Sequence, residues 1–181
     1  ILIGLQGAQY SNAGELDGHA PYVDGAPPDD GGGGAERGGV VQGLLRVRGL
    51  TQDDAHIFCR PDQVESEVNR VLKLAFHLLS SFGFHDYEIM LSTMPDKAVG
   101  ETSQWALATE SLQRTLESHN LTFGIDEGGG AFYGPKIDIH IRDAIGRQWQ
   151  ITTVQFDFNL PQRFGLKYIG DDGAEKQPYM I

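Results

Sequence analysis

The chain has 181 residues, a formal net charge of −11 at pH 7 and one cysteine, Cys59. This length suffices for one domain with a sizeable core, and the acidic balance argues against a surface that grips nucleic acid, because such contact depends on lysine and arginine. A single cysteine excludes an internal disulfide and fits a reducing compartment, and no apolar run approaches the roughly 20 residues that span a bilayer, so we expect a cytoplasmic, non-membrane protein.

Residues 1–35 differ in composition from the rest of the chain. Glycine and proline are dense there, and residues 31–34 are four consecutive glycines. Such a segment buries too little apolar surface to offset the entropy of ordering it. We expect residues 1–35 to be mostly disordered or a misread segment, and residues 36–181 to form the folded domain. Because the chain starts at Ile1 and stops at Ile181, we also expect it to be a piece of a longer protein.

The most informative stretch is Gly43–Cys59, with the sequence GLLRVRGLTQDDAHIFC. We predict a strand at Val40–Arg48, a bend at Gly49–Leu50 and an antiparallel neighbouring strand at Asp53–Cys59. Alternation along a strand directs residues 52, 54 and 56 to one side.

That side carries Gln52, Asp54 and His56, and the preceding strand adds Arg46. These side chains could bind a polar ligand, with the arginine as an anion clamp and the aspartate and histidine as acceptor and metal ligand. The alternative is a solvated sheet face whose charges pair with each other.

The remainder of the chain alternates between helical and extended patterns. Pro61 suits a first helical position, and apolar residues then follow helical spacing as far as Gly83, at 64, 68, 71, 72, 75, 78 and 79. A second amphipathic helix is predicted at Thr102–Ser118. Strands are predicted at Tyr87–Thr93, Leu121–Ile125, Lys136–Arg142 and Gln148–Asn159. The last two form a hairpin. In its first strand isoleucines 137, 139 and 141 face inward, and residues 136, 138, 140 and 142 face out. This pattern indicates an α+β fold with an antiparallel sheet flanked by helices.

Three stretches resemble class II aminoacyl-tRNA synthetases and, within that class, the threonyl-tRNA synthetase family. They are RVRGLTQDDAHIFC, AFYGPKIDIHIRDAIGRQWQ and VQFDFNLPQRF, in that order. The resemblance covers residues 36–181 and implies an incomplete class II catalytic domain. It further implies ATP-dependent activation of threonine and its transfer to tRNA(Thr), by a parent enzyme that is a homodimer. We expect the piece alone to be inactive.

The resemblance implies an ATP site made by Glu36, Arg46 and Gln52, with Mg²⁺ and Lys136 offsetting phosphate charge. Two positions depart from the family pattern: Gly34 stands where the family has an arginine, and Leu50 where it has a phenylalanine that stacks on adenine. A charged hydrogen bond is worth about 1.5–3 kcal/mol and a stacking contact about 1–3 kcal/mol, so loss of both would weaken ATP binding by about two to four orders of magnitude.

The resemblance also implies a Zn²⁺ ion that binds threonine, with His56 as one of three ligands and Asp54 accepting from the threonine hydroxyl. The positions of the other two ligands are missing from this chain, and one imidazole cannot hold the ion. In isolation His56 is an ordinary strand histidine.

Tyr133, Gln150 and Gln155 match further residues of the substrate pocket. Without the family, Tyr133 is a turn aromatic and Lys136 an exposed strand lysine. The odd separation of the two glutamines puts them on opposite faces of a regular strand, so a bulge between them is required. The family has Cys-Gly where this chain has Ile151 and Thr152, which makes the placement of Gln155 the hardest to predict.

Two other functions are compatible with the sequence. Gly34 and Leu50 favour a catalytically inactive synthetase-like protein that binds an amino acid or regulates a complex, whereas the intact threonine-pocket residues favour the enzyme. A tRNA-docking module is the third alternative, and the acidic balance argues against it.

Overall fold

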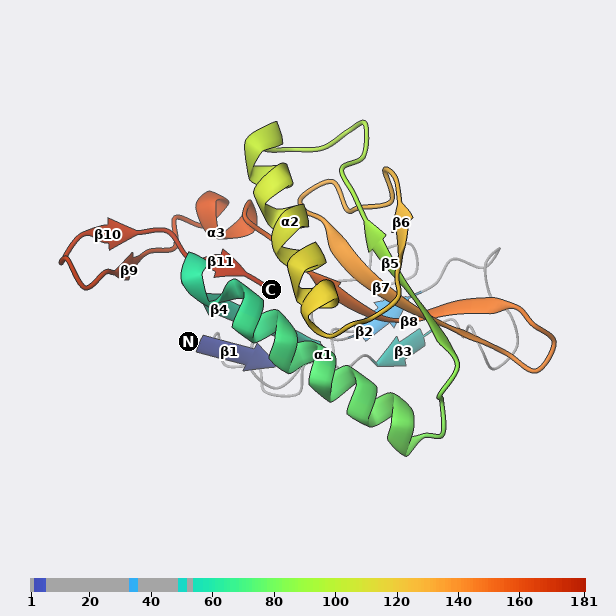
Figure 1. Cartoon of the computed structure of the whole chain (residues 1–181). Coiled ribbons are helices and arrows are strands. Elements are labelled where there is room, and N and C mark those ends of the chain that lie inside the picture. The colour runs from blue at the N-terminus through green and yellow to red at the C-terminus, as the bar shows by residue number, and fades with distance from the viewer. Residues whose placement is uncertain (1, 6–32, 36–48, 52–53) are drawn as a thin grey trace. The chain divides into compact units, whose positions relative to one another are not determined.

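The computed structural model describes residues 2–5, 33–35, 49–51 and 54–181 (Figure 1). It divides the chain into two compact units, one at Leu2–Ile57 and one at Phe58–Ile181. The predicted strand at Val40–Arg48 lies outside the described residues, as do Glu36, Arg46 and Gln52. The predicted division at residue 35 stays a prediction.

The described residues of the first unit include the short strands β1 at Leu2–Leu5, β2 at Gly33–Ala35 and β3 at Gly49–Thr51, and the beginning of β4, at Ala55–Cys59. Strands β2 and β3 pair antiparallel, and their register puts Gly34 opposite Leu50. The predicted bend at Gly49–Leu50 is therefore wrong, because both residues belong to a paired strand. The backbone groups of β3 are satisfied by β2, a partner that the local pattern of residues 40–59 does not reveal.

The second unit is built on a four-stranded sheet in the order β6-β5-β7-β8. Its strands are β5 at Tyr87–Ser92, β6 at Gly124–Asp126, β7 at Lys136–Arg142 and β8 at Gln148–Gln155. Strands β5, β7 and β8 pair antiparallel, whereas β5 and β6 pair parallel. The prediction for β7 is confirmed to the residue, but β8 ends four residues earlier than expected. The Phe156 amide still donates to the Pro135 carbonyl at 3.0 Å, but Pro135 has no N–H to donate in return, and Asp157 pairs with Met180 instead.

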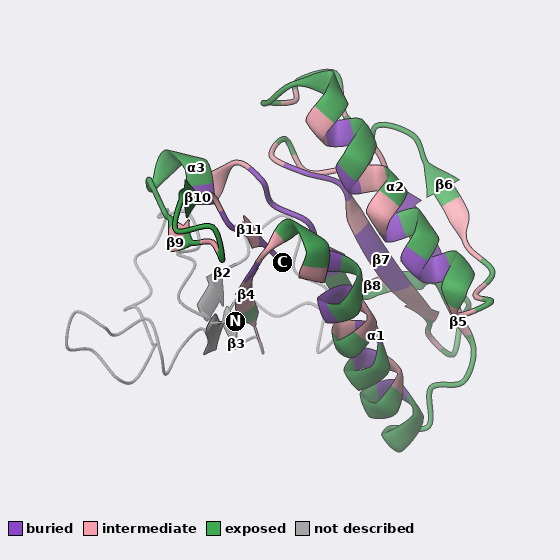
Figure 2. Ribbon diagram, turned by 60° about the vertical axis from the view of Figure 1, so that its left-hand side comes forward, coloured by how far each residue is buried: buried purple, intermediate pink, exposed green. Residues whose placement is uncertain are grey.

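Two helices cover one face of this sheet. A 3₁₀ turn at Pro61–Gln63 leads into α1 at Val64–Ser81, and α2 spans Thr102–Ser118 as predicted. Their buried residues, which include Leu72, Trp105 and Leu116, pack in one cluster with the sheet residues Ile89, Leu91, Ile137, Ile139 and Val154. Figure 2 shows the buried stripe that each helix turns towards the sheet. Leu78 departs from the predicted stripe, since it is 45% exposed.

The chain ends in short elements: α3 at Leu160–Arg163, β9 at Tyr168–Ile169, β10 at Glu175–Lys176 and β11 at Tyr179–Met180. Strand β4, at Ala55–Cys59, pairs antiparallel with β11 through its last two residues. Within the described part of the chain, no helix is long and apolar enough to cross a membrane. The observed arrangement confirms the predicted α+β class.

Candidate functional site

The sheet face opposite the helices carries three rows of mostly polar side chains. Alternation along β7 puts residues 137 and 139 in the core and residues 136, 138 and 140 on the other face. The register across β5, β7 and β8 then aligns these residues in rows. The rows are Ser92–Lys136–Gln155, Met90–Asp138–Thr153 and Glu88–His140–Gln150.

Asp138 lies at the centre of this face and accepts hydrogen bonds through both carboxylate oxygens. Its Oδ2 accepts from Lys136 Nζ at 2.5 Å and from Ser92 Oγ at 3.0 Å. Its Oδ1 accepts from Gln150 Nε2 at 2.7 Å and from Thr153 Oγ1 at 2.9 Å. The residue is 2% exposed, so the expectation that it faces out is only half right: it is on the predicted face, but it is buried there among its hydrogen-bond partners.

A bulge in β8 puts both predicted glutamines on this face. The register shifts between Ile139 and His140, which pair with Thr152 and Gln150, so Ile151 is the extra residue. An extra residue changes which face the following residues point to, and Gln150 and Gln155 therefore share the polar face despite their odd separation. The predicted bulge is confirmed, and it forms without the glycine that the family has there.

Tyr133 joins Gln155 at the end of the site. The Tyr133 hydroxyl donates to Gln155 Oε1 at 3.0 Å, and Gln155 Nε2 reaches the Gly134 carbonyl at 3.4 Å. Gly134 allows this approach, since a Cβ at that position would lie 1.8 Å from the Phe156 carbonyl oxygen. The loop before β7 thus lies against the end of β8, and Tyr133, Lys136, Gln150 and Gln155 are brought together.

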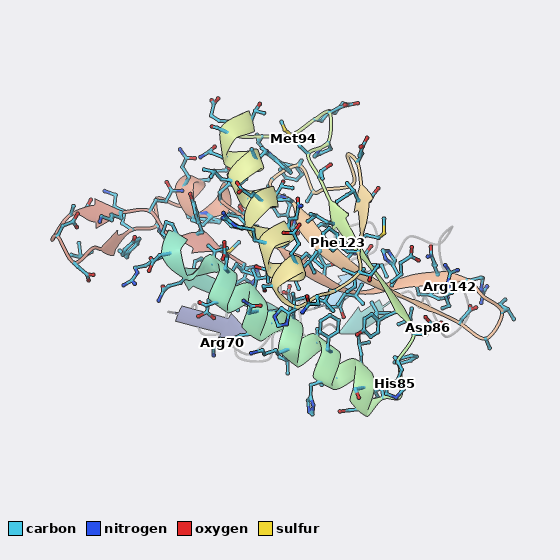
Figure 3. The ribbon with its side chains drawn as sticks, viewed as in Figure 1. Arg70, His85, Asp86, Met94, Phe123 and Arg142 are labelled. Carbon is cyan, nitrogen blue, oxygen red and sulfur yellow. The ribbon has the colours of Figure 1, made fainter. Side chains whose placement is uncertain are left out.

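The tip of the β7–β8 hairpin is closed by Asp143. Its Oδ1 accepts from the backbone amides of Ile145 and Arg147, and its Oδ2 from Trp149 Nε1 at 3.0 Å and Arg147 Nε at 2.7 Å. The indole N–H, and then the guanidinium, hold the pKa of this carboxyl well below its usual value. Figure 3 labels Arg142 on this hairpin, where it pairs with Glu88.

The other predicted site residues are not part of the polar cluster formed by Ser92, Tyr133, Lys136, Asp138, Gln150, Thr153 and Gln155. Glu36, Arg46 and Gln52 lie outside the described residues. Asp54 and His56 belong to the first compact unit and are partly exposed. No group of three His, Cys, Asp or Glu side chains among residues 54–181 and the short described strands could hold a metal. The described residues therefore do not by themselves suffice for the zinc that the resemblance implies.

Three residues of the cluster were not predicted as site residues: Ser92, Asp138 and Thr153. Asp138 could have been found from sequence, because a carboxylate two positions after Lys136 on a strand must share its face. Ser92 and Thr153 carry no such signal, since their proximity depends on strand order and on the bulge at Ile151.

Comparisons with known proteins identify the family of this chain. A family model described as "tRNA synthetase class II core domain (G, H, P, S and T)" matches residues 35–181. The threonine–tRNA ligases of Sulfurihydrogenibium sp. (strain YO3AOP1) and Synechococcus sp. (strain CC9902) are 58% and 59% identical to the chain over 146 residues, which are 81% of this chain and 23% and 24% of the relatives. The chain thus spans about a quarter of their length.

Solved structures show the same similarity. The RNA binding domain of threonyl-tRNA synthetase from Cryptosporidium parvum Iowa II superimposes with a TM-score of 0.77 and 40% sequence identity, over 82% of this chain and 38% of that one. The family predicted from the three motifs is confirmed. The chain belongs to the class II aminoacyl-tRNA synthetase core-domain family and, within it, is similar to threonine–tRNA ligases.

Proposed function

We propose that this chain is part of the catalytic domain of a threonine–tRNA ligase. The parent enzyme activates threonine with ATP to give threonyl-adenylate and pyrophosphate, and then transfers the threonyl group to tRNA(Thr). This chemistry needs charge stabilisation and in-line positioning rather than a covalent nucleophile. The polar face of β7 and β8 provides groups of that kind.

The observation that carries the proposal is the meeting of Tyr133, Lys136, Gln150 and Gln155 on one face. The resemblance assigns Tyr133, Gln150 and Gln155 to the substrate pocket and Lys136 to the reacting phosphate, and the two glutamines share the face only because of the bulge at Ile151. A sheet face that served only solubility would not need that irregularity.

We assign roles by the chemistry of each group. Lys136 offsets negative charge beside the reacting phosphate, together with Mg²⁺ that accompanies ATP. Tyr133 and Gln155, joined by a hydrogen bond, bind the amino-acid side of the adenylate, and Gln150 binds nearby. The resemblance adds Glu36, Arg46 and Gln52 at the nucleotide, Asp54 at the threonine hydroxyl and His56 as a zinc ligand; any metal site needs ligands from elsewhere in the parent.

A chimera tests this function. The matching 146-residue segment of the Sulfurihydrogenibium ligase is replaced by that of this chain, and threonine-dependent exchange between ATP and pyrophosphate is measured. We expect exchange with threonine and none with valine, and none from the 181-residue chain alone. A chimera that folds and binds tRNA but catalyses no exchange would refute the proposal. Replacing Lys136 with methionine in an active chimera is the control for the site.

A second candidate function is favoured by one observation. Gly34 and Leu50, which depart from the family pattern, are cross-strand partners in β2 and β3, so both departures affect one place. A synthetase-like protein that binds threonine without using ATP would have such changes. Calorimetric titration separates the two functions, because that protein binds threonine and not ATP.

We further propose a cytoplasmic parent that forms a homodimer. The cytoplasmic location is supported by the free, buried thiol of Cys59, the only cysteine of the chain. The homodimer is supported by the family resemblance. Sedimentation of the parent protein tests the dimer.

A further inference from the structure

Asp138 is the one residue of the polar face, as far as the structure describes it, that contacts both a charged and an amide side chain of the proposed pocket. We propose that Asp138 is a positioning residue, which holds Lys136 and Gln150 in the orientation in which they meet the adenylate. This inference depends on the proposed function and adds to it a residue that touches no substrate.

The two oxygens of Asp138 hold different partners. Oδ2 accepts from the Lys136 ammonium at 2.5 Å and also from the Ser92 hydroxyl. Oδ1 accepts from the Gln150 amide at 2.7 Å and also from the Thr153 hydroxyl. A carboxylate offers about four lone-pair sites, and four donors occupy them. Gln150 Nε2 also reaches Thr153 Oγ1 at 2.7 Å, so the amide is held on both sides.

The partners of Asp138 are side chains that need fixing. Lysine and glutamine have among the largest rotamer freedom of all residues, and a pocket that must order them on binding loses affinity. Asp138 itself is held firmly, because it lies between Ile137 and Ile139, both fully buried on β7. Its carboxylate is therefore a fixed hydrogen-bond acceptor that orients the flexible side chains of Lys136 and Gln150.

A purely structural role explains the network less well. Ile137 and Ile139 anchor β7 in the hydrophobic cluster on the other face, and Asp138 is not part of that cluster. A threonine or valine at this position would be an ordinary strand residue without the cost of burying a carboxylate. The buried charge is instead compensated by Lys136, whose side chain is 17% exposed and so reaches the surface of the site.

The test uses the 181-residue chain and the variant Asp138→Asn. An asparagine presents one oxygen and one NH₂ group, so either Lys136 or Gln150 loses its acceptor. Asp172→Asn is the matched control, because Asp172 is an exposed carboxylate that pairs with Lys176 at 2.9 Å, away from the site. Proton NMR measures water exchange of the Gln150 side-chain amide and of the Lys136 ammonium, and the backbone spectrum shows whether each variant is folded.

We expect Asp138→Asn to speed exchange at one of these two groups by at least about tenfold, and Asp172→Asn to change neither. Unchanged exchange at both groups in folded Asp138→Asn would overturn the inference. If that variant does not fold, Thr153→Val decides, since Thr153 is exposed and Asp138 remains. Gln150 should then keep one protected amide proton; loss of protection at both would show that Thr153 holds it, and would overturn the inference.

A binding measurement separates this inference from the proposed function. A non-hydrolysable sulfamoyl analogue of threonyl-adenylate is titrated into the three folded proteins. We expect Asp138→Asn to bind about tenfold to a hundredfold more weakly than the unmodified chain, as for loss of a charged hydrogen bond, and Asp172→Asn to bind equally. Equal affinity in all three would overturn the inference and leave the function standing. If the unmodified chain does not bind the analogue, the same three-way comparison is made in the chimera described above, where no binding would count against the function, and amide exchange would still decide the role of Asp138.

Discussion

Replacing Gly134 with alanine tests how closely the loop before β7 approaches β8. A Cβ at this position would lie 1.8 Å from the Phe156 carbonyl oxygen and 3.0 Å from its carbonyl carbon. Both atoms belong to the backbone, so no rotamer change can relieve the overlap. The loop and the end of β8 must move apart by more than about 1 Å to restore van der Waals contact.

The cost follows from what that movement breaks. Forcing an extra methyl group into a packed region costs about 1–3 kcal/mol. Separation also breaks the hydrogen bond from the Phe156 amide to Pro135 and that from Tyr133 to Gln155, at about 1 kcal/mol each. We therefore expect Gly134→Ala to lower the free energy of unfolding by about 3–5 kcal/mol.

Equilibrium unfolding in urea, followed by circular dichroism, measures this change. Gly146→Ala is the control: Gly146 has a φ of +82° and a methyl group there would meet no atom within 4 Å, so only backbone strain of about 1–2 kcal/mol should appear. If the two variants unfold at urea midpoints corresponding to less than about 1 kcal/mol of difference, the close approach at Gly134 does not exist as described.

Three further predictions concern other parts of the second unit. The Trp149 indole N–H lowers the pKa of Asp143, so the stability that this carboxylate gives the hairpin is present above its ordinary pKa of about 4 and is lost only at lower pH. The NMR chemical shift of the indole proton should therefore stay constant from about pH 7 to 4. A titration midpoint of that shift near pH 4 would contradict this. Burial, followed by nearby acidic charge, raises the pKa of Cys59 to about 11, so iodoacetamide at pH 8 should alkylate the native chain at least about a hundredfold more slowly than the chain in urea. Trp105→Ala should lower the free energy of unfolding in urea by about 3–5 kcal/mol, because this residue is 1% exposed. Leu107→Ala in the same helix should lower it by less than about 1 kcal/mol, because Leu107 is 59% exposed. Equal decreases would contradict the core assignment.

Local patterns predicted the helices and the long hairpin well. The helix at Thr102–Ser118 and the strand at Lys136–Arg142 have the predicted bounds, because helical and strand periodicity are properties of consecutive residues. The bend at Gly49–Leu50 failed for the opposite reason. Its outcome depends on pairing with Gly34 and Ala35, which lie some distance away in the sequence.

The candidate site was predictable only in part. The need for a bulge followed from the spacing of Gln150 and Gln155 once both were assigned to one pocket, but its position at Ile151 depends on the register with β7. The burial of Asp138 was missed, since alternation tells which face a residue takes and not whether that residue is exposed there. The roles of Glu36, Arg46, Gln52, Asp54 and His56 stay predictions.

The ion pair between Lys136 and Asp138 also determines how the molecule responds to ionic strength. Its side chains are only 17% and 4% exposed, so dissolved ions screen it far less than a pair on the surface. The pairs Arg142–Glu88 and Lys167–Glu175 are about half exposed or more and should weaken in concentrated salt. The Lys136–Asp138 pair should therefore persist at high salt concentration, while the pairs that join Arg142 to Glu88 and Lys167 to Glu175 loosen.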